Sequence, residues 1–172
     1  MSEILVNEIK HRNGTSAMTI NSDGTINKSV LPAWRVSLVN DMTGLGASTT
    51  YVITFDDISN TTRNLFIQGG CTISSGVVTV PVSGIYQINA NIRVDDITSG
   101  YANMKIEINS STTSNTTTYS IEGTPSASYQ TISAHSIFKL NANDTVRITV
   151  FASSDASWQL QDYSSFSGAL IG

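Results

Sequence analysis

The chain has 172 residues and a formal net charge of −4, and only 13% of its residues are charged. This length suits a single domain with a short additional segment, and it is sufficient to bury a sizeable core. The nine lysines and arginines are scattered along the sequence, which argues against binding to nucleic acid. Ser, Thr and Asn are abundant, as is usual on the solvent face of a sheet and in turns.

The N-terminal ten residues lack the basic start and long apolar run of a signal peptide. No stretch approaches the roughly 18 apolar residues of a membrane span, so no membrane insertion is expected. Cys71 is the only cysteine, which excludes an intrachain disulfide and a zinc cluster. We expect Cys71 to be a small buried hydrophobe, with a nucleophile or an interchain bridge as the alternatives. The sequence thus predicts a protein that is made in a cytoplasm and either stays there or leaves by lysis or as part of a particle.

Residues 1–31 predict a short N-terminal arm of three very short β segments. The segments are Ile4–Lys10, Asn13–Thr15 and Met18–Ile26, with Asn/Gly and Asp-Gly turns. Such an arm buries too little apolar surface to be a domain of its own. We therefore expect it to be ordered against sister chains or against a particle.

The arm also carries a loose motif, in which Val-Asn-x-Ile (6–9) is followed by Gly-Thr (14–15) and by Ile-x-x-Asp-Gly (20–24). This motif resembles the N-terminal arm of small structural proteins in tailed bacteriophages, especially marine and cyanobacterial ones. The resemblance implies that residues 1–31 anchor the chain to other virion proteins or swap between subunits.

From residue 32 onward, apolar and polar residues alternate with a period of two. This periodicity is typical of strands with one buried face. Polar tracts at 110–118 and 122–128 indicate loops, the first leading into a strand near Thr117–Ile121. No useful length shows helical spacing, so the sequence predicts an all-β protein. The alternating runs are Tyr86–Val94, Ala102–Ile108, Ile132–Leu140 and Val146–Val150.

Several motifs resemble the globular head of complement-one-q proteins, a branch of the tumour-necrosis-factor superfamily. The central one, Val78–Ile88, is a hairpin with a Pro-Val-Ser-Gly corner, and the C-terminal Ser165–Gly172 is a strand broken by one glycine. The weaker matches are the opening strand Pro32–Leu38, the strand Tyr51–Phe55 followed by Asn60, and the tight connection marked by Leu140, Asp144 and Val146.

The resemblance implies an antiparallel two-sheet jelly roll over residues 32–172, of the kind that trimerises around a three-fold axis and binds other molecules. We expect the Gly84–Val94 strand to be central and the Phe166–Ile171 strand to close the sheet. In the implied homotrimer, the large side chains of Trp34, Tyr86 and Phe166 are divided between the core and the axial contact.

Residues that could carry chemistry are few. His11 lies in the arm and His135 on the polar face of a strand, and neither belongs to a recognisable catalytic set. The acidic residues Asp56, Asp57, Asp95, Asp96, Asp155 and Asp162 could hold calcium, but the regular spacing of a calcium loop is missing. No catalytic residue, metal or other cofactor is therefore expected.

One group of side chains suggests a ligand site. Trp158 and Tyr163, near Asp155 and Asp162, could form an aromatic platform for a sugar ring. Trp158 as a trimer contact or as a loop anchor is an equal alternative.

Together these features predict a non-enzymatic, trimeric surface protein of a bacteriophage virion. A tail-fibre or adsorption knob and a capsid decoration protein are not separable by sequence. The expected partners are sister chains, other virion proteins and a host surface glycan or receptor. The alternative is a free complement-like lectin, against which the missing signal peptide and collagen-like stem argue. A glycan-active enzyme is disfavoured because no paired-carboxylate signature is present.

Overall fold

The computed structural model describes residues 8–10, 16–28, 30–58, 60–110, 116–122, 129–155 and 157–172. The described residues form strands and turns and contain no helix. Within these ranges there is accordingly no helix with the length and apolar character needed to cross a membrane. The chain divides into two compact units, residues 1–31 and residues 32–172.

The first unit is an antiparallel sheet of β1 (Glu8–Lys10), β2 (Ser16–Ile20) and β3 (Ile26–Lys28), in that order. The turn between β2 and β3 is closed by Asp23, whose Oδ1 accepts hydrogen bonds from the amide and the hydroxyl of Thr25. These bonds hold the pKa of Asp23 below its usual value. The turn divides the predicted segment Met18–Ile26 into two strands, while the predicted segment Asn13–Thr15 lies outside the described residues.

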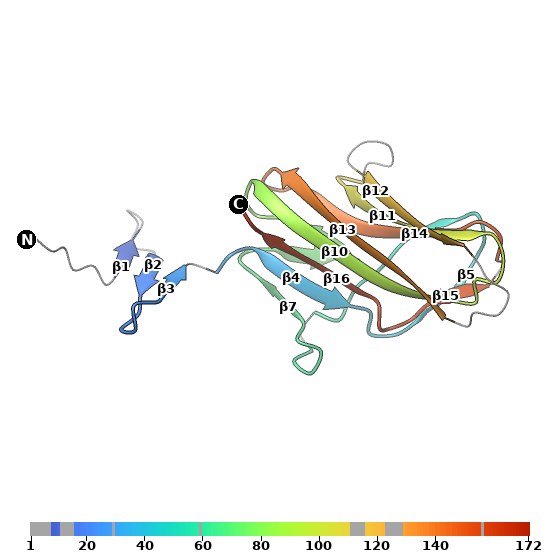
Figure 1. Ribbon diagram of the computed structural model, residues 1–172, viewed down its shortest axis with the longest axis horizontal. Helices are drawn as coiled ribbons and strands as arrows, with labels where there is room; N and C mark the ends of the chain where they lie inside the picture. Colours follow the sequence, from blue (N-terminus) through green and yellow to red (C-terminus); the bar gives the residue numbers. More distant parts are fainter. Residues whose placement is uncertain are drawn as a thin grey trace, which may run out of the picture. The chain divides into compact units, whose positions relative to one another are not determined.

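In the second unit, the first sheet is built around β10, a long strand that pairs with β13 along its whole length (Figure 1). On its other side, β10 pairs with β16 through its first half and with β15 at its end. Beyond β16 lie β4 and β7, and beyond β15 lies β5. The strands of this sheet are β4 (Ala33–Ser37), β5 (Met42–Leu45), β7 (Phe66–Gln68), β10 (Gly84–Asp95), β13 (Tyr129–Leu140), β15 (Trp158–Leu160) and β16 (Ser165–Leu170).

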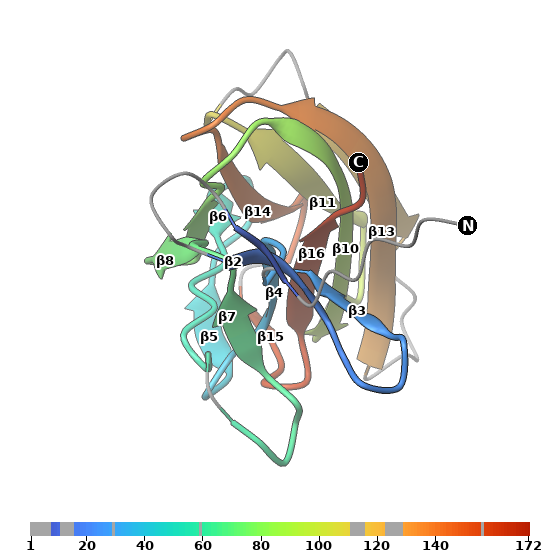
Figure 2. The same cartoon turned by 90° about the vertical axis from the view of Figure 1, so that its left-hand side faces the viewer.

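The second sheet has the order β12-β11-β14-β9-β8, and β6 pairs with the far half of β14. Figure 2 shows this sheet facing the β10 sheet across the interior. All the pairings in both sheets are antiparallel. The strands are β6 (Thr50–Val52), β8 (Thr72–Ser74), β9 (Val77–Thr79), β11 (Tyr101–Ile108), β12 (Thr116–Glu122) and β14 (Thr145–Ala152).

The core fills the space between the two sheets. Every second residue of β10, β11 and β14 is apolar and buried, because successive side chains of a strand point to opposite faces. Trp34, Tyr86 and Phe166 are all buried, and the ring centroid of Trp34 lies 6.4 Å from that of Tyr86 and 5.5 Å from that of Phe166. All three side chains therefore belong to the core, rather than to a contact between subunits. Cys71 is also buried, as expected.

The observed architecture confirms the predicted all-β jelly roll, with β10 at the centre of its sheet. The C-terminal strand is placed differently from the prediction. It does not close the sheet, because β16 pairs with β10 on one side and β4 on the other. The predicted strand near Thr117–Ile121 corresponds to β12. Most of the two predicted loops lies outside the described residues, at 111–115 and 123–128.

Candidate functional site: the exposed face of the β10 sheet

The face of the β10 sheet that points away from the core carries several large exposed side chains. Ile137 on β13 is 63% exposed and Tyr129, at the start of the same strand, is 54% exposed. Tyr163, in the turn before β16, is 68% exposed. Small polar residues, such as Ser133 and Ser167, occupy much of the same face. Aromatic side chains such as these tyrosines are enriched in the surfaces through which proteins contact one another.

At one end of this face, Arg93 lies between two tyrosines. Its guanidinium carbon is 3.8 Å from the ring centroid of Tyr129 and 5.7 Å from that of Tyr163. Arg63 approaches Tyr163 as well, at 5.9 Å from the ring centroid. A planar guanidinium over an aromatic ring is an attractive arrangement, and arginine and tyrosine are enriched in protein interfaces.

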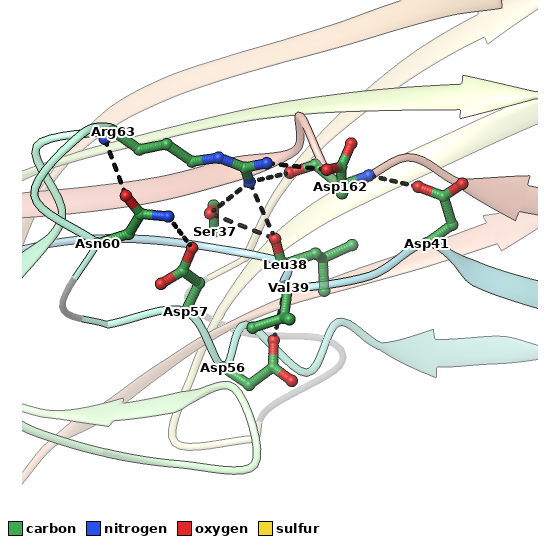
Figure 3. Close-up of polar contacts among 9 residues, drawn as sticks. All are labelled: Ser37, Leu38, Val39, Asp41, Asp56, Asp57, Asn60, Arg63 and Asp162. Atoms are coloured by element: carbon green, nitrogen blue, oxygen red, sulfur yellow. Dashed lines mark hydrogen bonds and ion pairs between the residues drawn. The ribbon is translucent and has the colours of Figure 1, made fainter.

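Arg63 also connects its own turn by hydrogen bonds to two other segments of the chain, which contain Leu38 and Asp162 (Figure 3). Its Nη2 donates a hydrogen bond of 2.8 Å to Oδ2 of Asp162, and its Nη1 donates to the carbonyl oxygens of Asp162 and Leu38 at 3.1 and 3.3 Å. A longer bond of 3.4 Å reaches the hydroxyl of Ser37. The carboxylate of Asp162 raises the pKa of the Arg63 guanidinium. The turn that carries Arg63 is thereby attached to β4 and to the loop before β16.

The acidic residues around this arginine act as acceptors for the chain itself (Figure 3). Asp56 accepts a hydrogen bond of 2.9 Å from the amide of Val39, and Asp41 accepts one of 2.7 Å from the amide of Asp162. Asp57 accepts the side-chain amide of Asn60. Among the described residues, no group of three or more His, Cys, Asp or Glu side chains is arranged to hold a metal ion.

The structure does not assemble the predicted sugar platform. Trp158 is 1% exposed, donates its indole N–H to the carbonyl of Gly46 at 3.2 Å, and packs edge-on against Tyr51. Its ring is therefore covered, because the alternation of β15 turns it into the core. Asp155 accepts hydrogen bonds from the amides of Thr98 and Ser99 and from the hydroxyl of Thr98.

The other two members of the predicted platform belong to a different loop. Asp162 pairs with Arg63, and Tyr163 lies between Arg63 and Arg93. A ligand role for Asp155, Asp162 and Tyr163 stays a prediction, and Trp158 takes the alternative role of an anchor. His135 lies on the exposed face of β13, as expected, while His11 is outside the described residues.

Arg93, Tyr129 and Ile137 were not predicted from the sequence as members of a functional surface. A signal was present for Ile137, since it is an apolar residue on the otherwise polar face of an alternating strand. No local feature of the sequence predicts the Arg93–Tyr129 contact. The 35 residues between the two positions include β11 and β12 of the second sheet, and the contact forms only because β10 pairs with β13.

Similar folds occur in solved structures that share little sequence with this chain. A crystal structure of murine APRIL superposes with a TM-score of 0.61 and 12% identity, covering 82% of this chain and 99% of that one. The globular domain of zebrafish complement 1qA gives 0.55 and 19%, with 83% and 98% covered. Eiger TNF from S. frugiperda gives 0.59 and 10%, with 83% and 93% covered. These likenesses establish the fold alone.

No curated protein sequence matches this chain. The family model of the C1q domain, in contrast, matches residues 33–171, which includes every strand of the second unit. The match covers both the Pro-Val-Ser-Gly corner and the C-terminal strand. The chain therefore belongs to the C1q domain family, whose domains typically form homotrimers and are generally not enzymes.

Proposed function

We propose that the chain is a non-enzymatic, homotrimeric surface protein of a tailed-bacteriophage virion. Residues 1–31 attach it to other virion proteins, and the C1q-like head is exposed to bind a host surface glycan or to stabilise the particle. The observation that carries the trimer is the exposed face of the β10 sheet, in a domain whose relatives typically form homotrimers. The virion role is supported by the likeness of the arm to phage structural proteins.

Two features support the face of the β10 sheet as the contact between subunits. The first is the set of large side chains Ile137, Tyr129 and Tyr163, which are more than half exposed in a single chain. The second is the pairing of tyrosines with Arg93, a combination often found among the residues that dominate interface energies. Because Ile137 is 63% exposed in the single chain, its burial would contribute about 1–2 kcal/mol per subunit.

Light scattering after size exclusion tests the trimer. The native protein at micromolar concentration should have three times the 18.4 kDa mass of one chain. Ile137→Lys should lower the mass toward a single chain, because a charge would be buried without a partner. Val82→Lys is the matched control, since Val82 is 43% exposed at the corner before β10 and not on the sheet face. A single-chain mass for the native protein would refute the trimer.

Deletion of residues 1–31 tests the attachment. The remaining unit contains the whole hydrophobic core of the head, so we expect a soluble trimer that no longer incorporates into particles. Full incorporation of the shortened protein would contradict the anchoring role. Absence of the native protein from purified particles would favour the free lectin instead.

Labelling of imaged particles distinguishes the two virion roles. Label at the tail supports an adsorption protein, and label over the capsid shell supports a decoration protein. Particles that lack the protein should adsorb poorly in the first case and break more easily in the second.

A further inference from the structure

The outward face of the second sheet carries a hollow of about 260 Å³. It lies over β11, β14 and β6, which are labelled in Figure 2. The hollow opens on the opposite side of the sandwich from the face proposed for assembly, so a trimer formed through the β10 sheet leaves it accessible. Its side walls and floor are formed by Thr50, Tyr101, Asn103, Lys105, Thr149 and Phe151.

The register of the strands explains why these residues meet. Phe151 is the partner of Asn103 on one side and of Thr50 on the other, and Lys105 is the partner of Thr149. Their side chains share the outward face because the alternate residues of β11 and β14 fill the core. The hollow is therefore formed by residues of regular strands and not by a loop.

One wall of the hollow is aromatic. The ring centroids of Tyr101 and Phe151 are 6.0 Å apart, with their planes tilted by 36°. Tyr101 is 43% exposed, although it stands at the start of a strand where a small polar residue would suffice. Sugar rings present apolar C–H faces that pack on such aromatic surfaces, while their hydroxyls need polar partners at the edges.

Apart from Val150 the remaining lining is polar, and Lys105 is the charged residue among the described side chains that form it. Glu107, which is 1% exposed, lies next to the floor and accepts a hydrogen bond of 3.1 Å from the hydroxyl of Thr149. Its charge is neutralised by Arg147, whose Nε and Nη2 are both 2.8 Å from Glu107 Oε2. Neither of the two ion pairs between described side chains, Arg63–Asp162 and Arg147–Glu107, involves Lys105, and no acidic residue is among the described side chains that line the hollow. An anionic group is therefore favoured there.

We propose that this hollow binds one saccharide unit that carries a carboxylate, as part of a surface glycan. The sugar ring packs on Tyr101 and Phe151, and its carboxylate is held by the ammonium of Lys105. The volume is below the ~300–1,000 Å³ of typical pockets for drug-sized ligands, which fits one sugar unit rather than a chain. The inference rests on the glycan-recognition part of the proposed function and names its substrate class.

A site of this size binds a single sugar weakly. Three copies on one trimer gain affinity through a high effective concentration when the glycan is displayed on a surface. Amide chemical shifts of the full-length protein are therefore the appropriate readout for monovalent probes. Suitable probes are methyl β-D-glucuronide and the methyl α-glycoside of N-acetylneuraminic acid, with methyl β-D-glucoside as the neutral match.

We expect at least one acidic probe to shift amides of β11 and β14 in a saturable way, and the neutral probe to bind more weakly. Lys105→Gln should weaken the acidic probe by about tenfold, because a hydrogen bond to a charged group is lost. Tyr101→Ala should abolish binding, while Tyr101→Phe should retain it. Lys105→Arg is the matched control, since it keeps the positive charge at the same position on β11 and should retain binding of the acidic probe.

The inference is overturned if neither acidic probe gives saturable shifts, if the neutral probe binds equally well, or if Lys105→Gln has no effect. The mass by light scattering and the incorporation into particles are measured independently on the same preparations. Lost sugar binding by a trimeric, incorporated protein refutes the site alone, whereas a single-chain mass or absence from particles refutes the proposed function.

Discussion

Replacement of Gly168 by alanine should destabilise the head by about 3 kcal/mol. A Cβ atom at this position would lie 2.3 Å from Cζ2 and 2.4 Å from Cη2 of Trp34 on the neighbouring strand. Carbon atoms in contact are normally ~3.5–4.0 Å apart, so the indole ring must move by about 1 Å. The ring is 1% exposed and is packed against Tyr86 and Phe166. Overpacking in cores costs ~1–3 kcal/mol, and a ring enclosed in this way places the cost at the upper end.

Thermal unfolding followed by circular dichroism measures the effect. A loss of about 3 kcal/mol should lower the Tm by ~6–12 °C in a chain of this size. All variants are compared at one chain concentration, because the stability of an oligomer depends on it. Gly46→Ala is the matched control. A Cβ atom there would be 3.5 Å from the Tyr51 hydroxyl, an ordinary contact, so its Tm should change little.

A second substitution tests whether the steric clash between the new Cβ atom and the Trp34 ring causes this loss of stability. Trp34→Phe shortens the ring, and it sacrifices no hydrogen bond, since Trp34 Nε1 is buried without a partner in the described part of the chain. The two changes together should therefore cost less than the sum of the single changes, by about 1 kcal/mol or more. Gly168→Ala with a Tm within about 2 °C of the native protein, or strictly additive costs, would refute the reasoning.

Three further results are expected. Arg147→Met should lower the free energy of unfolding, measured with urea, by about 3–5 kcal/mol, because the buried Glu107 loses its counter-charge. Adding Glu107→Gln should restore part of this stability, and a double variant as unstable as Arg147→Met would contradict the explanation. Burial raises the pKa of Cys71 to about 11, so native protein at pH 8 should not react with a thiol reagent that modifies the unfolded chain. Because the unfolded thiol ionises first, stability should fall as pH rises from about 9 toward 11, and Cys71→Ala should remove that contribution. Arg63→Lys should speed amide exchange in the loop around Asp162, since lysine cannot reproduce the fork of contacts, and unchanged exchange would show that the contacts are dispensable.

Much of the head can be read from local patterns. The run from Tyr86 to Val94 alternates strictly, and the structure has a strand there because a sheet with one buried face needs that period. The corner before β10 and the C-terminal motif are also short segments, and they point to the family that the C1q model confirms. Cys71 as a buried thiol follows from the side chain alone.

The place of a strand in its sheet, and of a side chain in the core or on the surface, could not be predicted from local sequence. β16 has the composition of a closing strand, but β4 pairs with its outer side, and no local feature encodes which strand lies beyond it. Trp158 illustrates the same limit, since an aromatic residue among polar neighbours is compatible with an exposed platform and with a core anchor. The choice depends on Tyr51 and Gly46, more than a hundred residues away in the chain.

The long alternating strands, the class of fold and the family could be predicted from the sequence, because alternation and turn chemistry act over a few residues. Which side chains meet on the two outer faces could not be predicted in this way. Arg63 and Asp162 are 99 residues apart, and Tyr101 and Phe151 become neighbours only through the pairing of β11 with β14. Such contacts arise from the order and register of strands, which depend on the packing of the whole core.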